Sequence, residues 1–122
     1  MKRRVLVVDD SEIVLGKASE ALVSGGYDVS TALSAMEADD YLYGPDKPDL
    51  VIMDVMMPQL DGDKKAKLLK LDDTTRDIPI LLLSSKSEDE LVTLAREACC
   101  DGFIRKPFTS VQLIAKVAET LR

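Results

Sequence analysis

The chain has 122 residues, of which 46% are hydrophobic and 31% are charged. This length predicts a single domain over residues 1–122, and the apolar content excludes a disordered chain because it suffices to form a core. The formal net charge of −6 argues against direct binding to nucleic acids or anionic membranes, since both attract basic surfaces. No apolar run approaches the roughly 20 residues that cross a bilayer.

The cysteine and histidine contents restrict the chemistry further. The two cysteines, Cys99 and Cys100, are adjacent, and no export signal precedes Asp9, so we expect a reducing, cytoplasmic environment. The chain has no histidine, which excludes catalysis by Ser-His-Asp or Cys-His groups and histidine-ligated metals. Any metal must be bound by oxygen atoms, which favours Mg²⁺ or Ca²⁺.

The first half of the chain alternates apolar runs with helical patterns. A strand is predicted over 4–8, followed by a helix that ends at Gly25-Gly26 and whose apolar stripe is Val14, Ala18, Ala21 and Leu22. A short, polar strand over 28–31 comes next, and its polarity predicts a place at the edge of a sheet. A weaker helical pattern covers about 35–43.

The second half repeats this alternation three times. Strands are predicted over 50–54, 78–83 and 102–105, and a helical pattern follows each of them. The first of these helices covers about 62–71. The other two carry apolar stripes, formed by Leu91, Leu94, Ala95 and Ala98 and by Ile114, Val117, Ala118 and Leu121.

Three helix starts carry the sequence of a capping box, in which a hydroxyl residue is followed three positions later by Glu or Gln. These pairs are Ser34 with Glu37, Ser87 with Glu90, and Thr109 with Gln112.

Five consecutive strand–helix units predict an α/β fold with an open parallel sheet, because parallel neighbours need crossover helices. The expected architecture is flavodoxin-like (βα)5, with strand order 2-1-3-4-5 and helices on both faces. The ligand crevice of such a sheet lies beyond the carboxyl ends of its first and third strands.

Polar residues follow four of the predicted strands. Asp9 and Asp10 end the first, Asp54 the third, Ser84 the fourth and Lys106 the fifth. Since these ends emerge along one edge of a parallel sheet, we expect Asp54 to be accessible there and to lie close to Asp10 and Lys106.

This combination predicts a site for phosphoryl chemistry. Three neighbouring carboxylates repel one another unless a cation lies among them, and a hard divalent cation with oxygen ligands suits them best. Lys106 and Ser84 then offer a positive charge and a donor for phosphoryl oxygens, and attack by Asp54 would form an acyl phosphate. Each residue alone has an ordinary structural explanation, such as a helix cap, a turn or a solvated lysine; the joint order along the strands favours the functional one.

The same residues resemble the receiver domain of two-component response regulators, over essentially the whole chain. The resemblance rests on Val5-Leu-Val-Val-Asp9-Asp10, Asp54-Val-Met-Met-Pro58, Asp61-Gly62, Leu83-Ser84-Ser85 and Lys106-Pro107-Phe108.

The resemblance implies a role for each site residue. Asp54 would accept a phosphoryl group from a phosphohistidine on a sensor kinase or a histidine phosphotransfer protein. Asp10, Asp54 and the backbone carbonyl of Met56 would ligate Mg²⁺, with Asp9 acting largely through water. Lys106 would bind the phosphate, and a cis bond between Lys106 and Pro107 would direct the lysine inward. Ser84 and Phe103 would be the switch residues.

The resemblance also implies a signalling phosphoacceptor rather than a conventional enzyme, one that catalyses only its own phosphorylation and slow dephosphorylation. Its fourth helix, fifth strand and fifth helix would form the surface read by an output protein or domain. A homodimer formed on phosphorylation is a further implied possibility.

Two positions near the site bear on the lifetime of the phosphorylated form. Met56 and Lys86 should flank the path of a hydrolytic water, and an apolar thioether offers that water no good hydrogen bond. Slow self-dephosphorylation is therefore expected.

Three other readings of the sequence compete with this one. A phosphatase of the haloacid dehalogenase type would need an acid where Met56 stands, and a flavodoxin would need a phosphate-binding loop where Asp9-Asp10 stands. The alternative that remains is a pseudo-receiver, a phosphorylation-independent interaction module; the complete acidic set argues against it.

Overall fold

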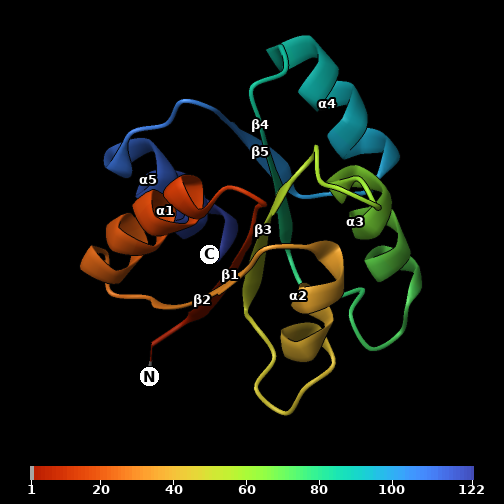
Figure 1. The fold of residues 1–122 in the computed structure, drawn as a ribbon, viewed down its shortest axis with the longest axis horizontal. Coiled ribbons are helices and arrows are strands. Elements are labelled where there is room, and N and C mark those ends of the chain that lie inside the picture. The colour runs from red at the N-terminus through yellow and green to blue at the C-terminus, as the bar shows by residue number, and fades with distance from the viewer. Residues whose placement is uncertain (1) are drawn as a thin grey trace.

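The computed structural model describes residues 2–122 as one parallel sheet with helices on both of its faces (Figure 1). The strand order is β2-β1-β3-β4-β5, which confirms the predicted topology, with β2 at an edge. The strands are β1 (Arg4–Val8), β2 (Asp28–Ala32), β3 (Leu50–Asp54), β4 (Ile80–Ser84) and β5 (Gly102–Arg105).

Two helices cover one face of the sheet and three cover the other (Figure 1). On the first face lie α1 (Glu12–Ser24) and α5 (Ser110–Thr120); on the second lie α2 (Ala35–Leu42), α3 (Gly62–Leu71) and α4 (Glu88–Glu97). None of these helices, over residues 2–122, has the length and apolarity to cross a bilayer.

The central strands are apolar at every position because each of their faces has its own core. Leu6, Val51 and Leu82 point into the core beneath α2, α3 and α4. Their neighbours in the chain, such as Val7 and Ile52, point into the core beneath α1 and α5. Continuous apolar runs are therefore what strands covered on both sides require.

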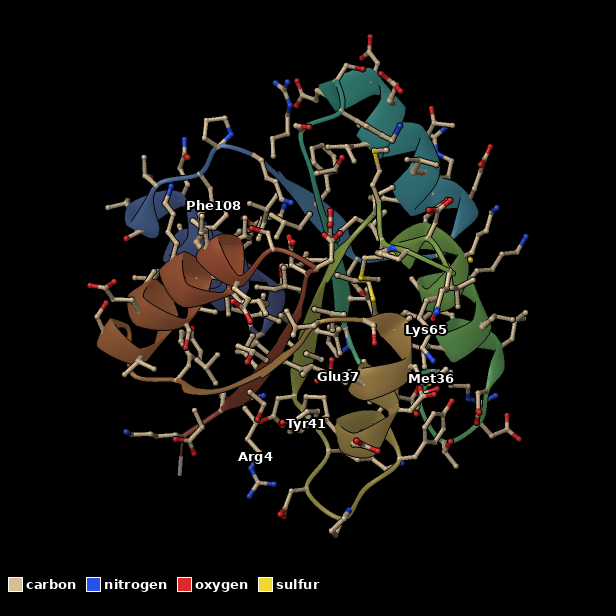
Figure 2. The ribbon with its side chains drawn as sticks, viewed as in Figure 1. Arg4, Met36, Glu37, Tyr41, Lys65 and Phe108 are labelled. Carbon is tan, nitrogen blue, oxygen red and sulfur yellow. The ribbon has the colours of Figure 1, made fainter. Side chains whose placement is uncertain are left out.

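Contacts of lysine side chains also join neighbouring segments on each face of the sheet. On one side Lys65 of α3 reaches toward α2 and pairs with Asp39, although its side chain is almost fully buried (Figure 2). On the other side Phe108 packs between α5 and α1, with the Lys17 ammonium 4.9 Å from its ring centroid (Figure 2).

Three predicted strand boundaries were wrong. The fourth strand begins at Ile80 instead of Ile78 and extends to Ser84. Pro79 has no N–H to donate, and the N–H of Ile78 is used in a turn, where it donates to the carbonyl of Thr75. The predicted second strand ended one residue too early, since β2 continues to Ala32.

The helical stripes were predicted with the right period but with some errors of position. Leu15, instead of Val14, is buried in α1, and Leu113, which the predicted stripe of α5 omits, has no exposed surface. Ile114 is only partly buried because it packs at the margin of that layer, near Gly25.

All three predicted N-cap residues cap their helices, but only one full capping box forms. Thr109 and Gln112 exchange both hydrogen bonds at the start of α5. Glu37 instead accepts from the N–H of Leu33, one residue before the cap, and Glu90 accepts from the Ser87 hydroxyl. N-cap residues are thus recognisable from residue type. The second hydrogen bond of the box, from the N-cap backbone N–H to the Glu or Gln side chain, depends on the local path of the chain.

The loop after β3 packs tightly against the strand end that carries Asp54. Gly62, the first residue of α3, donates its N–H to the carbonyl of Val55 over 2.8 Å. A Cβ at this glycine would lie 1.9 Å from the Asp54 carbonyl oxygen, so only glycine fits. Gly16, in the middle of α1, has no such neighbour within 4 Å.

This difference predicts opposite effects of the same substitution at two helical glycines. Gly62→Ala should lower the free energy of unfolding by about 2 kcal/mol or more, because a backbone atom must move. Gly16→Ala should raise it by about 0.5–1 kcal/mol, the cost of glycine inside a helix. Urea denaturation of both variants measures this, and a Gly62→Ala protein as stable as the parent would contradict the packing described.

Candidate functional site

The polar residues predicted at the strand ends do meet at one edge of the sheet. Val8 pairs with Met53, and Asp54 pairs with Leu83, so Asp9, Asp54 and Ser84 follow at nearly the same level of the sheet. Carboxylate oxygens of Asp9, Asp10 and Asp54 lie within 4.8 Å of one another. The predicted proximity of Asp54 to Asp10 is confirmed.

Lys106 supplies the positive charge of this cluster. Its ammonium lies 2.8 Å from Asp9 Oδ2 and 3.4 Å from Asp54 Oδ1, so the predicted proximity to Asp54 is also confirmed. The lysine is positioned by its backbone N–H, which donates to the Ser84 carbonyl at the end of β4. The bond from Lys106 to Pro107 is cis, as the family resemblance implied.

The cluster leaves one buried oxygen poorly satisfied. Asp9 is fully buried, and its Oδ1 accepts a hydrogen bond from the N–H of Ser11 over 2.9 Å. Asp9 Oδ2 forms an ion pair with the Lys106 ammonium over 2.8 Å and has no further partner. A buried carboxylate whose one cation is shared with Asp54 favours the approach of a further cation.

Burial and repulsion perturb the acid–base properties of Asp54. Burial raises the pKa of this carboxyl from 3.8 to about 6, and the negative charge of Asp9 adds to the effect. Lys106 and the backbone N–H of Met56 act in the opposite direction. Burial lowers the pKa of Lys106, but its contacts with Asp9 and Asp54 outweigh that effect and the pKa is raised.

The expectation that Asp54 would be accessible was wrong. Its side chain retains only 6% of its exposure, because it ends a strand covered on both faces and Lys106 lies against it. Asp10 and Met56, in contrast, are exposed beside it, the latter by 64%. The surface near Asp54 therefore includes these two residues.

The two predicted switch residues lie on β4, the strand next to Asp54, and on β5, one strand farther away. The Ser84 hydroxyl, which is buried, accepts a hydrogen bond from the N–H of Lys86 over 3.1 Å. Phe103 is half-buried on β5, where it pairs with Leu82 and packs against the core beneath α4.

A hollow of about 540 Å³ lies between the loop after β3 and α4, and Val55, the residue after Asp54, is part of its wall. Met56 and Lys86 both line this hollow. The wall also includes Asp61, Asp63, Asp89, Glu90, Thr93 and Leu94. The sequence predicted Glu90 in a capping box; its position in the wall of this hollow depends on how α4 packs, and no motif marks it.

Comparison with known proteins identifies the family. The model of the response regulator receiver domain matches residues 5–118, which is nearly the whole chain. The chain belongs to this family. It is a receiver domain of the two-component response regulators, and receiver domains bind Mg²⁺ at an acidic pocket such as the one formed by Asp9, Asp10 and Asp54.

Among the relatives of this receiver domain are transcriptional regulators. It is 37% identical over 122 residues to the response regulator MprA of Mycolicibacterium vanbaalenii and covers 52% of that protein. It is also 37% identical over 122 residues to the alkaline phosphatase synthesis transcriptional regulatory protein PhoP of Bacillus subtilis, of which it covers 50%. The chain thus spans about half the length of these curated relatives.

Solved structures of receiver domains resemble it closely. The chemotaxis response regulator CheY4 of Vibrio cholerae is 28% identical, with a TM-score of 0.91, and 99% of this chain and 100% of that one are covered. The BeF3-activated receiver domain of DrrB is 32% identical, with a TM-score of 0.83 and coverage of 99% and 98%.

The raised pKa of Asp54 predicts a specific pH dependence of stability in the presence of a chelator. Because the folded-state pKa of about 6 exceeds 3.8, the native protein holds this proton more tightly than the unfolded chain does. The resulting stability is present below about pH 4 and is lost as the pH rises through about 6. The Asp54→Asn variant has no carboxyl to ionise at this position, so it does not lose stability in this way. Urea titrations should therefore find that its free energy of unfolding, relative to that of the parent, increases from pH 4 to above pH 6. A difference that stays constant with pH would contradict the raised pKa of Asp54.

Proposed function

We propose that this receiver domain accepts a phosphoryl group on Asp54 from a phosphohistidine of a sensor kinase or histidine phosphotransfer protein. The observation that carries the proposal is the meeting of three carboxylates with the Lys106 ammonium at one edge of the sheet. A structural role alone would not explain it, because the arrangement places two buried acids side by side at a cost in stability.

The donor set fits Mg²⁺. The cluster offers only hard oxygen atoms, and the buried Asp9 Oδ2 has no partner other than Lys106. Asp10, Asp54 and the carbonyl of Met56 would hold the ion, and Asp9 would act on it largely through water. When bound, the ion would neutralise charge that develops on the phosphoryl oxygens.

The protein's own residues perform the transfer. An Asp54 oxygen attacks phosphorus as the bond from phosphorus to the kinase histidine breaks, and the product is an acyl phosphate. Lys106, already 3.4 Å from Asp54 Oδ1, would bind an oxygen of the transferred group. Burial of Asp54 limits access of water and strengthens these electrostatic contacts.

Phosphorylation would then change the surface formed by α4, β5 and α5. It adds about −1.5 to −2 charges and three acceptor oxygens at the strand ends. The Ser84 hydroxyl would leave the N–H of Lys86 to donate to the phosphate, and the half-buried Phe103 would turn inward. Such a switch shifts the equilibrium between two conformations that already exist, and only contacts that differ between these conformations can shift it.

This surface would be recognised by a downstream output protein or domain, and a homodimer formed on phosphorylation is one way to present it. The domain spans residues 1–122 and catalyses only its own phosphorylation and slow dephosphorylation. We propose a cytoplasmic location and no direct contact with nucleic acid or membrane, consistent with the net charge of −6.

The alternative is a pseudo-receiver that binds partners without phosphorylation. Asp9, Asp10, Asp54 and Lys106 lie together, and an interaction module would have no need of this set. The DrrB receiver domain, which is similar in structure, is described as activated by BeF3, and this supports the phosphoacceptor proposal.

Incubation with acetyl phosphate and Mg²⁺ tests the proposal directly. Intact-mass measurement should find one added phosphoryl group, and peptide mapping should place it on Asp54. A chelator should abolish the modification, as should Asp54→Asn. A haloacid dehalogenase-type phosphatase, a flavodoxin or a pseudo-receiver would not retain this group, so an unmodified parent protein would refute the proposal.

The side chain at position 56 should control the lifetime of the phosphorylated form. Met56 follows Asp54 by two residues and lines the hollow between the loop after β3 and α4. Its thioether offers an attacking water only a weak hydrogen-bond acceptor. Met56→Asn should accelerate loss of the phosphoryl group by about fivefold or more, the factor that one ordinary hydrogen bond provides. The decay is measured by intact mass after removal of the donor, and an unchanged rate would count against this role.

A further inference from the structure

The described methionines divide into two buried and two exposed side chains. Met53 and Met57 have 0% and 6% of their surface exposed and belong to the core beneath α2, α3 and α4. Met36 and Met56 are 73% and 64% exposed. Since oxidation of a thioether requires access of the oxidant, Met36 and Met56 are the chemically vulnerable pair.

Only one of this pair is close to Asp54 along the chain. Met56 follows Asp54 by two residues and lines the hollow between the loop after β3 and α4. Met36 projects from α2 (Figure 2) and borders a different hollow, together with Pro58 and Lys65. The exposed thioether of Met56 therefore belongs to the loop that directly follows the phosphoacceptor.

We propose that Met56 is a peroxide-sensitive residue whose reversible oxidation to the sulfoxide shortens the lifetime of the phosphorylated receiver. The proposal rests on the proposed function of Asp54. In the oxidation a peroxide transfers one oxygen atom to the sulfur and leaves as water. In the reversal two thiols take up that oxygen as water and become a disulfide, as in methionine sulfoxide reductases.

The change in chemistry at this position is large. A thioether is a weak acceptor, whereas the sulfoxide oxygen is a polar acceptor on the same side chain. The hollow also presents the Lys86 ammonium, which is held only loosely, 3.9 Å from Glu90 Oε2. A sulfoxide oxygen there can accept from a water and orient it toward the phosphoryl group on Asp54. Hydrolysis then consumes one water and yields free Asp54 and inorganic phosphate.

The fold should tolerate this modification. The exposed Met56 side chain belongs to neither core, so an added oxygen meets solvent instead of packed side chains. The same oxygen on Met53 would be forced into a core that has no room and no donor. Oxidation at position 56 therefore changes the site without unfolding the domain.

The experiment measures the lifetime of the phosphoryl group before and after limited peroxide treatment of the whole chain. A thiol reductant is added after the peroxide, because Cys99 is also exposed and its reversible oxidation products must be removed. Peptide mapping should find the sulfoxide at Met36 and Met56 and not at Met53 or Met57. The protein is then phosphorylated with acetyl phosphate and Mg²⁺, the donor is removed, and decay is followed by intact mass.

We expect the oxidised parent to lose its phosphoryl group about fivefold faster than the untreated protein, again the factor of one hydrogen bond. Methionine sulfoxide reductase should restore the original rate. Met56→Leu keeps an apolar side chain without sulfur, and its decay rate, whatever its starting value, should not change with peroxide. Met36→Leu is the matched control and should respond as the parent does. Met56→Gln, which carries an amide oxygen, should decay faster without any peroxide.

The outcomes separate this inference from the function on which it rests. An untreated protein that takes no phosphoryl group refutes the proposed function, and the inference falls with it. If the untreated protein is phosphorylated but oxidation leaves its lifetime unchanged, only the inference is overturned. An equal response of Met56→Leu and the parent would also overturn it, because the effect would then come from another residue.

Discussion

The repulsion among three carboxylates at one edge of the sheet is the constraint on which the rest of this receiver domain depends. Asp9 and Asp54 are almost fully buried, and a single ammonium, that of Lys106, lies between them. Burial raises the pKa of Asp54, and the negative charge of Asp9 adds to this rise, which the one positive charge of Lys106 only partly offsets. The apolar cores on both faces of the sheet must provide the stability that this arrangement costs.

The sheet brings these groups together because its strands are parallel and closely matched in register. Each central strand changes from apolar to polar residues at the same level, so the two cores end where the charged cluster begins. Gly62 extends this positioning beyond the strand, since its missing Cβ lets the start of α3 approach the Asp54 carbonyl. The cluster is thus held by backbone packing as well as by its own charges.

Much of this could be predicted from the sequence, because continuous apolar runs and their polar ends are local signals. The strand order and the meeting of Asp9, Asp54 and Lys106 follow from such signals and from the rules for parallel sheets. The errors arose where a position depends on contacts far along the chain. Leu113 was missed because the pattern of α5 fits two adjacent stripes, and only packing against α1 selects between them.

The burial of Asp54 belongs to the same class of error. A polar residue at a strand end suggests exposure, but here Lys106, from the far end of the chain, lies against the carboxylate. The hollow lined by Met56 and Lys86 was expected as a route for water, while the acidic residues of α4 that complete its wall were not. Local sequence identifies which residues carry the chemistry; their accessibility is decided by segments that only the fold brings near.

The position of Lys106 couples the parts of the site to one another. Its ammonium is closer to Asp9, at 2.8 Å, than to Asp54, at 3.4 Å, so in this state it mainly compensates the deeper carboxylate. For Lys106 to serve an oxygen bound to Asp54 it must give up part of its contact with Asp9, which would leave a buried charge without a partner. A cation beside Asp9 removes that penalty. In the proposed function, binding of the ion and release of the lysine toward Asp54 would therefore be favourable together and unfavourable separately, and this linkage would make acceptance of a phosphoryl group dependent on the metal.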